Sequence, residues 1–210
     1  FAAGGVGFAV GNILLARVLP PQEYGYVALF LALIQLAITL GPVGLETVIN
    51  RHHLGASTAL LVRSFGTSTV VGIGIAVAAS LFYGMGVALA AVLVVSALAA
   101  SLNKVAGSFF QSRKRFGLSL FLNQVHNWIV LCSVPVVMAF ERPDALPAAL
   151  TITAGYCVMA AAGWWRAMRE HAHGEVSQQK LLQEGLAAMG TQAQVLRTRA
   201  ATAGVKARAS

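Results

Sequence analysis

Residues 17–30 read RVLPPQEYGYVALF, a short polar segment between two long apolar runs. Neither the preceding run, residues 1–16, nor the following run, residues 27–40, contains a charged side chain. A helix that spans a bilayer needs about 20 largely apolar residues, and each run approaches that length. Adjacent prolines and a nearby glycine favour a turn. The segment is therefore expected to be a hairpin between two membrane-spanning helices.

The composition agrees with this interpretation. The chain has 210 residues, of which 57% are hydrophobic and only 10% are charged, and its mean hydropathy is +0.72. A soluble domain is typically about one quarter charged, so this chain lacks the charge to cover a soluble surface. The net charge of +8 would suggest nucleic acid as the partner of a soluble protein. In a membrane protein the position of the charge matters more, and we expect no nucleic-acid partner.

The apolar runs predict an all-α integral membrane protein with one six-helix transmembrane bundle over residues 1–170. The runs are continuous, whereas barrel strands would show alternating segments of roughly ten residues. The predicted helices cover residues 1–19, 26–49, 65–83, 85–110, 118–140 and 145–165. Residues 171–210 are polar and basic, and we expect a cytoplasmic tail that is weakly helical or disordered. Because the chain starts at Phe1 without methionine, we expect a fragment.

The distribution of Lys and Arg predicts the orientation, because cytoplasmic loops carry an excess of these residues. Eight basic residues lie at or after the ends of the second, fourth and sixth predicted helices, namely Arg51, Arg63, Lys104, Arg113, Lys114, Arg115, Arg166 and Arg169. The alternate loops contain only Arg142. Both termini are therefore expected on the cytoplasmic side, and the positive charge would face anionic headgroups there.

Several polar residues within the spans are not explained by topology. Arg17 lies near the outer end of the first span, where it would either extend to the headgroups or face a cavity and bind an anion. Gly41 and Pro42 interrupt the second span, because proline removes a backbone donor; they predict a kink, either architectural or a hinge.

Glu46 follows this interruption within the same predicted span. An ionisable carboxylate there is costly and normally has a partner or faces water. Its partner would be Asn50 or Arg51 at the inner end of the helix, or Glu46 would face a cavity. Both interpretations make these three residues candidates.

The fifth predicted span carries the clearest polar face. Asn123, His126 and Asn127 are spaced i, i+3 and i+4, so they project from one side of a helix, and Gln124 is offset by one position. They would either hydrogen-bond to neighbouring helices and hold the bundle together, or form the polar wall of a translocation cavity.

Two further patterns bear on packing and chemistry. Gly7 and Gly11 form a GxxxG pattern, which favours close contact between helices. We find no paired carboxylates, metal-ligand motif or nucleophile motif in the spans. The sequence therefore favours a transporter or a structural membrane protein over an enzyme, with no metal or other cofactor expected.

An arginine near the end of the first span, then LPPQEYG, then GPVGLETVINR closing the second, resembles the start of the polysaccharide biosynthesis (Wzx-like) oligosaccharide flippases. These belong to the multidrug/oligosaccharidyl-lipid/polysaccharide exporter superfamily. Residues 107–128, GSFFQSRKRFGLSLFLNQVHNW, are also similar to that family. The resemblance covers about residues 1–170, which would be one lobe of a fold with 12–14 helices in two lobes.

The resemblance implies translocation of an undecaprenyl-diphosphate-linked oligosaccharide across the bacterial cytoplasmic membrane. Basic residues would meet the diphosphate in a central cavity, with Arg17 and Arg51 as the best candidates. Partners would be the lipid-linked oligosaccharide, the bilayer, a second six-helix lobe and other polysaccharide-assembly proteins. The alternatives are a multidrug or lipid II exporter of the same superfamily, or a non-transporting membrane scaffold or fragment. An integral membrane glycosyltransferase would need larger outer loops.

Overall fold

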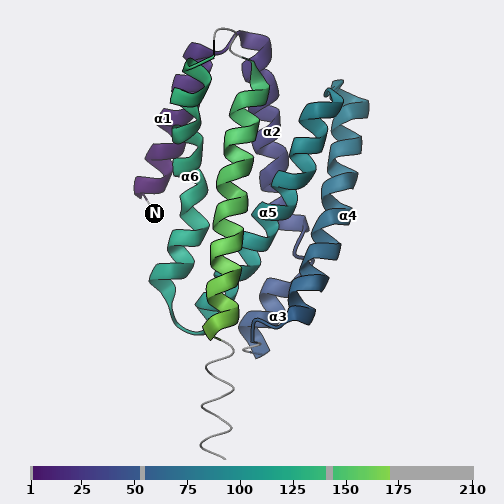
Figure 1. The fold of residues 1–210 in the computed structure, drawn as a ribbon, viewed down its shortest axis with the longest axis vertical. Helices are drawn as coiled ribbons and strands as arrows, with labels where there is room; N and C mark the ends of the chain where they lie inside the picture. The colour runs from purple at the N-terminus through teal and green to yellow at the C-terminus, as the bar shows by residue number, and fades with distance from the viewer. Residues whose placement is uncertain (1, 53–54, 141–143, 171–210) are drawn as a thin grey trace, which may run out of the picture. The chain divides into compact units, whose positions relative to one another are not determined.

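The computed structural model describes residues 2–52, 55–140 and 144–170, and every regular element within these ranges is a helix (Figure 1). In chain order these are α1 (Ala2–Val18), α2 (Pro21–Leu40), α3 (Leu45–His52), α4 (Thr58–Tyr83), α5 (Val87–Ser112), α6 (Phe116–Met138) and a final helix, Ala145–Glu170. The predicted all-α membrane fold is confirmed. The tail predicted for residues 171–210 lies outside the described residues.

Five helices of the described ranges are long and apolar enough to cross a membrane: α2, α4, α5, α6 and the final helix. The apolar part of α1 is shorter and covers Gly5–Val18. These six segments coincide with the six predicted spans, although several bounds differ.

The hairpin between α1 and α2 is tighter than predicted. Helix α2 begins at Pro21, so Gln22, Glu23 and Gly25 belong to its first turns rather than to a loop. Pro20 is the N-cap residue, with an extended backbone at φ −55° and ψ 149°. Proline is well tolerated at the first helical position, where its missing N–H would have had no partner in the helix. The two prolines therefore start the second helix as well as ending the turn.

The predicted helix over residues 26–49 is interrupted rather than kinked. Helix α2 ends at Leu40, residues 41–44 form turns, and α3 starts at Leu45. Val43 and Gly44 adopt left-handed backbone angles, with φ values of 45° and 76°. Because Pro42 has no N–H to continue the ladder, the helix ends just before it and the chain changes direction.

The other bounds differ at helix ends. Helix α4 starts at Thr58, seven residues before the predicted start at residue 65. The hydroxyl of Ser57 caps this end and accepts a hydrogen bond from the backbone N–H of Leu60 at 3.2 Å. Helix α4 ends at Tyr83, and the C-cap residue Gly84 adopts the left-handed conformation typical of a helix C-terminus (φ 64°). The final helix extends five residues beyond the predicted end at residue 165.

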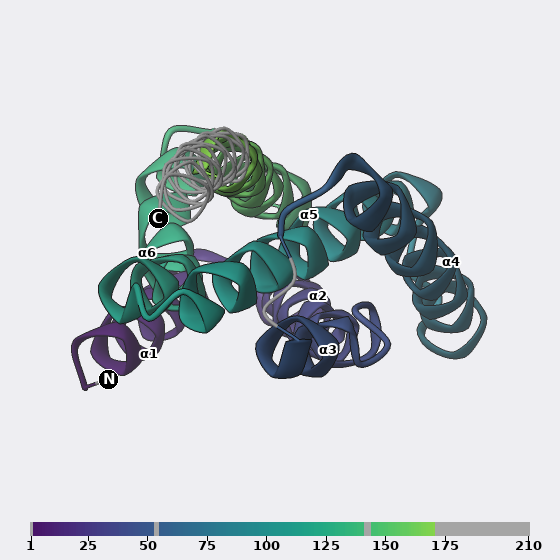
Figure 2. The ribbon, with the colours of Figure 1, turned by 90° about the horizontal axis from the view of Figure 1, so that it is seen from below.

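Helix α5 is the helix around which the others pack. It contacts α2, α3, α4 and α6, while α1 packs mainly along α6; in Figure 2 α5 crosses the bundle between these neighbours. Buried small residues such as Ala97 and Ala100 allow neighbouring backbones to approach α5 closely. The indole Nε1 of Trp164 in the final helix donates a hydrogen bond to the Leu102 carbonyl at 2.9 Å.

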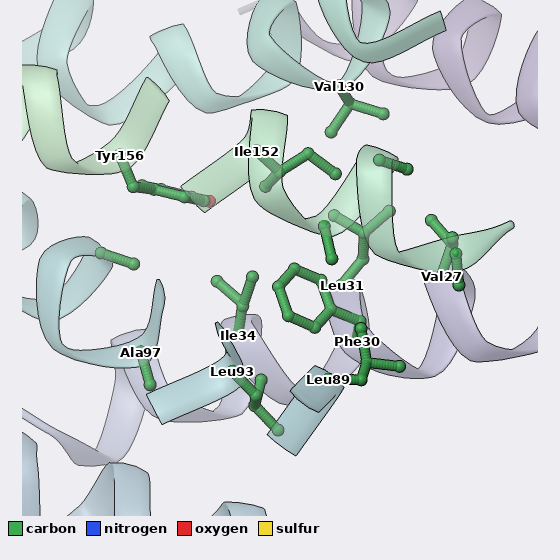
Figure 3. Close-up of a cluster of buried hydrophobic side chains, with 14 of the residues drawn as sticks. Val27, Phe30, Leu31, Ile34, Leu89, Leu93, Ala97, Val130, Ile152 and Tyr156 are labelled. Carbon is green, nitrogen blue, oxygen red and sulfur yellow. The ribbon is translucent and has the colours of Figure 1, made fainter. Parts of the chain in front are cut away.

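The buried side chains form two hydrophobic clusters. In the larger, Phe30 and Ile34 of α2 meet Leu93 of α5 and Ile152 of the final helix (Figure 3). The smaller packs α3 against α5, the start of α4, α6 and the final helix. Its buried members are Ile49, Ala56, Leu60, Val105, Ala106, Phe109, Phe110, Leu122, Trp164 and Ala167. Many large apolar side chains remain outside both clusters, such as Phe82, which is 82% exposed. Lipid is the surrounding in which such exposure is favourable.

Basic residues gather at one end of this bundle. Arg51 lies on α3, Arg63 in the second turn of α4, and Lys114 and Arg115 between α5 and α6. Figure 1 shows α3, the start of α4 and the α5–α6 connection at the same end. We refer to this end as the basic end; Arg17 lies at the opposite end, in the last turn of α1.

Close contact between α1 and α6 depends on the predicted GxxxG pair. A methyl group at Gly11 would lie 2.9 Å from the Leu131 nitrogen, and one at Gly7 would lie 3.3 Å from the Trp128 ring. The pattern therefore marks an interface between helices that lie far apart in the sequence.

Replacing Gly11 with Leu should separate α1 from α6 and destabilise the protein by about 1–3 kcal/mol, the usual cost of overpacking. Gly74→Leu is the matched control, because nothing lies within 4 Å of the position of its added Cβ. The midpoint of thermal unfolding in detergent, followed by circular dichroism, should fall for Gly11→Leu alone. Equal midpoints for the two variants would contradict the packing argument.

Candidate functional site

A polar cavity of about 620 Å³ lies between α2, α5, α6 and the final helix. Most of its lining comes from the parts of these helices that are nearer the basic end. The polar side chains that line it are Gln35, Asn103, Lys104, Gln111, Ser119, Asn123, Gln124, His126 and Tyr156. A hollow lined by this many hydrogen-bonding groups within an apolar bundle is the strongest candidate for a functional site.

The predicted polar face of α6 is divided between the cavity and the packing of the helix. Asn123 and His126 line the cavity, and so does Gln124. Asn127 is buried and does not line it; its Nδ2 donates a hydrogen bond to Gln124 Oε1 at 2.9 Å. Asn127 therefore orients a cavity residue from behind.

His126 joins three helices at the cavity wall. The Nε2 of Gln35, on α2, donates to His126 Nε2 at 3.4 Å, which requires the histidine tautomer with an unprotonated Nε2. The His126 ring stacks on Tyr156 of the final helix, with ring centroids 6.3 Å apart and an interplanar angle of 13°. The imidazole is thus placed by contacts from two other helices.

Asn103 and Gly107 of α5 shape the side of the cavity facing α6. Asn103 Nδ2 donates to the Leu122 carbonyl at 2.7 Å, while its buried Oδ1 has no hydrogen-bond partner among the described residues. A methyl group at Gly107 would lie 3.1 Å from the amide nitrogen of Asn123. The absence of a side chain at residue 107 therefore makes room for Asn123 at the wall.

Lys104 is the one Lys or Arg side chain among the described residues that line this cavity. By its sequence position Lys104 counts among the charges that set topology, whereas the structure places it within α5, eight residues before the helix ends. Its Nζ lies 3.8 Å from Glu46 Oε2 on α3, and both side chains are about one third exposed. The structure thus gives Glu46 a different partner from Asn50 or Arg51. The position of Lys104 beside Asn103, inside an apolar run, was the signal that could have identified it.

The remaining sequence candidates lie outside the cavity lining. Arg17 is exposed in the last turn of α1. Helix α2 rises roughly 20 Å between Pro21, next to the end of α1, and Gln35, at 1.5 Å per residue. Arg17 is therefore about that far from the level of Gln35. Arg51 is exposed on α3, and Asn50 is partly buried there with an unpartnered Oδ1.

Gly41 and Pro42, the hinge candidates, are buried in the turn between α2 and α3. A methyl group at Gly41 would lie 2.9 Å from the Cβ of Ser101. The Ser101 hydroxyl donates to the Ala37 carbonyl, near the end of α2, at 3.0 Å. This turn is therefore held against α5.

The chemistry available in the cavity is hydrogen bonding together with one positive charge. Amide, hydroxyl and imidazole groups offer both donors and acceptors, which suits a ligand with several hydroxyl groups. The Lys104 ammonium suits an anionic group such as a phosphate. Within the described residues no cluster of His, Cys, Asp and Glu has the arrangement of a metal site.

Comparison with known proteins gave one match. Residues 14–177 match the model of a family described as "Polysaccharide biosynthesis protein". This range contains the described cavity-lining residues and covers most of the chain. No curated protein and no solved structure matches the chain significantly.

Water access should distinguish the cavity from the exposed apolar surface of the same bundle. In a variant whose free cysteines, Cys132 and Cys157, are replaced by Ala, Asn123→Cys should react with a hydrophilic maleimide. Val136→Cys, on the exposed apolar side of the same helix, should react severalfold more slowly because a thiol in lipid does not ionise. Labelling would be followed by mass spectrometry on protein in lipid nanodiscs, and equal rates would contradict a water-filled cavity.

Proposed function

The chain belongs to the polysaccharide biosynthesis protein family, and from this premise we propose that it is one lobe of a flippase for lipid-linked oligosaccharides. Family membership together with the apolar helices makes it a multi-pass membrane protein of polysaccharide biosynthesis. The proposal goes further: an undecaprenyl-diphosphate-linked glycan passes from the cytoplasmic to the outer leaflet of a bacterial cytoplasmic membrane along the polar cavity, without a chemical reaction.

The observation that carries the proposal is a polar cavity inside a bundle whose outer surface is apolar. A lipid-linked glycan has a hydrophilic head that lipid rejects and an apolar chain that lipid accepts. The cavity offers neutral hydrogen-bonding groups to sugar hydroxyls and the Lys104 ammonium to the diphosphate. The exposed apolar residues leave the lipid chain free to remain in the bilayer.

We place the basic end in the cytoplasm, by the rule that Lys and Arg remain on that side. Both termini then face the cytoplasm, and the cavity is nearest the leaflet on which the substrate would be loaded. A second six-helix lobe would supply the opposite wall, and other polysaccharide-assembly proteins would deliver and remove the glycan.

The cavity disfavours the alternative of a cation-coupled drug exporter. Such a protein should have a deeply buried Asp or Glu, and the described lining residues include neither. Glu46 is partly exposed and paired with Lys104. A lipid II exporter would use the same chemistry with another glycan, and a scaffold would have no use for the cavity.

Disrupting the gene should leave lipid-linked glycan units on the cytoplasmic leaflet and remove the surface glycan. The measurement is leaflet-specific labelling of the lipid-linked glycan in spheroplasts and inverted vesicles, with the complemented strain as control. Normal surface glycan in the disrupted strain would overturn the proposal and favour the scaffold.

Replacing Asn123 and His126 together with Leu should lower the transport rate about tenfold or more, since each substitution removes hydrogen bonds worth about 1 kcal/mol. Arg17→Gln is the control, because Arg17 lies outside the cavity lining and should retain transport. Both variants should reach the membrane in equal amounts by immunoblot. A defect in Arg17→Gln alone would instead favour the anion-binding role first considered for that arginine.

A further inference from the structure

The ion pair at the cavity edge, between Glu46 and Lys104, has an unusual combination of properties. The distance of 3.8 Å between Nζ and Oε2 is longer than a hydrogen bond, and both side chains are 37% exposed. Lys104 has three donors, and no hydrogen bond of its ammonium to another described residue accompanies this pair. The ammonium is thus attracted to Glu46 without being saturated by it.

The position of Glu46 does not depend on this attraction. Ile49, one turn further along α3, is fully buried and packs in the smaller hydrophobic cluster with Phe109 and Phe110 of α5. Glu46 also lies in the first turn of α3, where the positive end of the helix dipole favours a carboxylate. The carboxylate would therefore stay in place, charged and partly hydrated, if Lys104 turned to another anion.

We infer that Glu46 is an intramolecular competitor that occupies the anion site of Lys104 and is displaced by a phosphate group of the substrate. This inference deepens the proposed function and rests on it for the identity of the anion. Displacement exchanges one charge-assisted contact for another, so the ammonium is never left without an anion in the cavity. A carrier gains from such exchange because a transported anion must bind well enough to enter and weakly enough to leave.

The competition makes a quantitative prediction about anion affinity. Exposed ion pairs contribute about 0.2–1 kcal/mol, a factor of about 1.4 to 5, so removing the competitor should tighten anion binding by up to about fivefold. Glu46→Gln should show this gain for inorganic pyrophosphate, and Lys104→Gln should remove measurable binding. Adding Glu46→Gln to the Lys104→Gln variant should not restore pyrophosphate binding, because Glu46 competes only for the lysine.

The measurement is isothermal titration of pyrophosphate into the full chain, purified in phosphatidylcholine nanodiscs. Lys114→Gln is the matched control for the lysine change, because Lys114 is exposed near the basic end and outside the cavity lining. Asp144→Asn, an exposed carboxylate at the opposite end, controls for the loss of a negative charge. Both controls should bind as the unmodified protein does, and size-exclusion chromatography should show all variants equally monodisperse.

Three outcomes would overturn the inference: unchanged or weaker binding in Glu46→Gln, equal tightening in Asp144→Asn, or tightening by Glu46→Gln in the absence of Lys104. A parallel titration in nanodiscs with phosphatidylglycerol separates a substrate phosphate from a bilayer headgroup. Affinity should persist there, and its loss would assign the site to phospholipid. The flippase proposal is tested separately by the leaflet distribution of the glycan in the strain with the disrupted gene. Tighter pyrophosphate binding by Glu46→Gln, together with a normal glycan distribution in that strain, would overturn only the transport role.

Discussion

The structure depends on how α5 satisfies its polar side chains away from water. Ser96 hydrogen-bonds to Thr153 of the final helix, Ser101 to the Ala37 carbonyl of α2, and Asn103 to the Leu122 carbonyl of α6. An unpaired polar group in a lipid-embedded bundle is costly, so each of these residues ties α5 to a different neighbour. Lys104 adds α3 through Glu46. One helix thereby sets the relative positions of four others.

This arrangement also explains why the cavity lies where it does. The α2, α6 and final helices are each tied to α5, and the cavity is the space that remains among them. Polar groups beyond those needed for packing, such as Asn123 and Gln35, line that space. The same residue types therefore serve two purposes. Asn127 supports Gln124 from within the packing, whereas Asn123, one helical turn earlier, faces the hollow.

Local patterns in the sequence predicted much of the fold, because apolar length and proline act within a few residues. They indicated where the five long apolar helices and the shorter α1 lie, where the chain breaks near Gly41, and that Asn123 and His126 share one side of α6. They did not place contacts between distant segments. The partners that the sequence offered Glu46, as an alternative to facing a cavity, were four or five residues away, whereas Lys104, with which it pairs, is 58 positions further along the chain. Such a pair depends on how α3 folds back against α5, which periodicity does not encode.

Arg17 and Lys104 show why the pattern of charge along the sequence did not identify the cation that lines the cavity. Both are single cations inside apolar runs, and only the position of Arg17 at the end of a span drew attention to it. Lys104 was grouped with the basic residues that follow α5, although a helix that continues to Ser112 places it about 12 Å from that helix end. Lys104 lines the cavity because α5 continues past it to Ser112, and the positive charge alone does not distinguish it from the other basic residues.

The two ends of the described bundle are built differently, and this difference gives the cavity a direction. At the end opposite the basic residues, Glu23 Oε2 accepts a hydrogen bond from the Ala145 N–H at 2.8 Å. The α1–α2 hairpin thus caps the final helix, and Leu19, Met85 and Ala145 are buried beside it. The half nearer the basic end instead contains the hollow lined by Lys104. Under the proposed transport of a lipid-linked glycan, the substrate head would enter from the basic end. Its passage to the other side would then require the contact between Glu23 and the final helix to open, or a second lobe to provide the way around it.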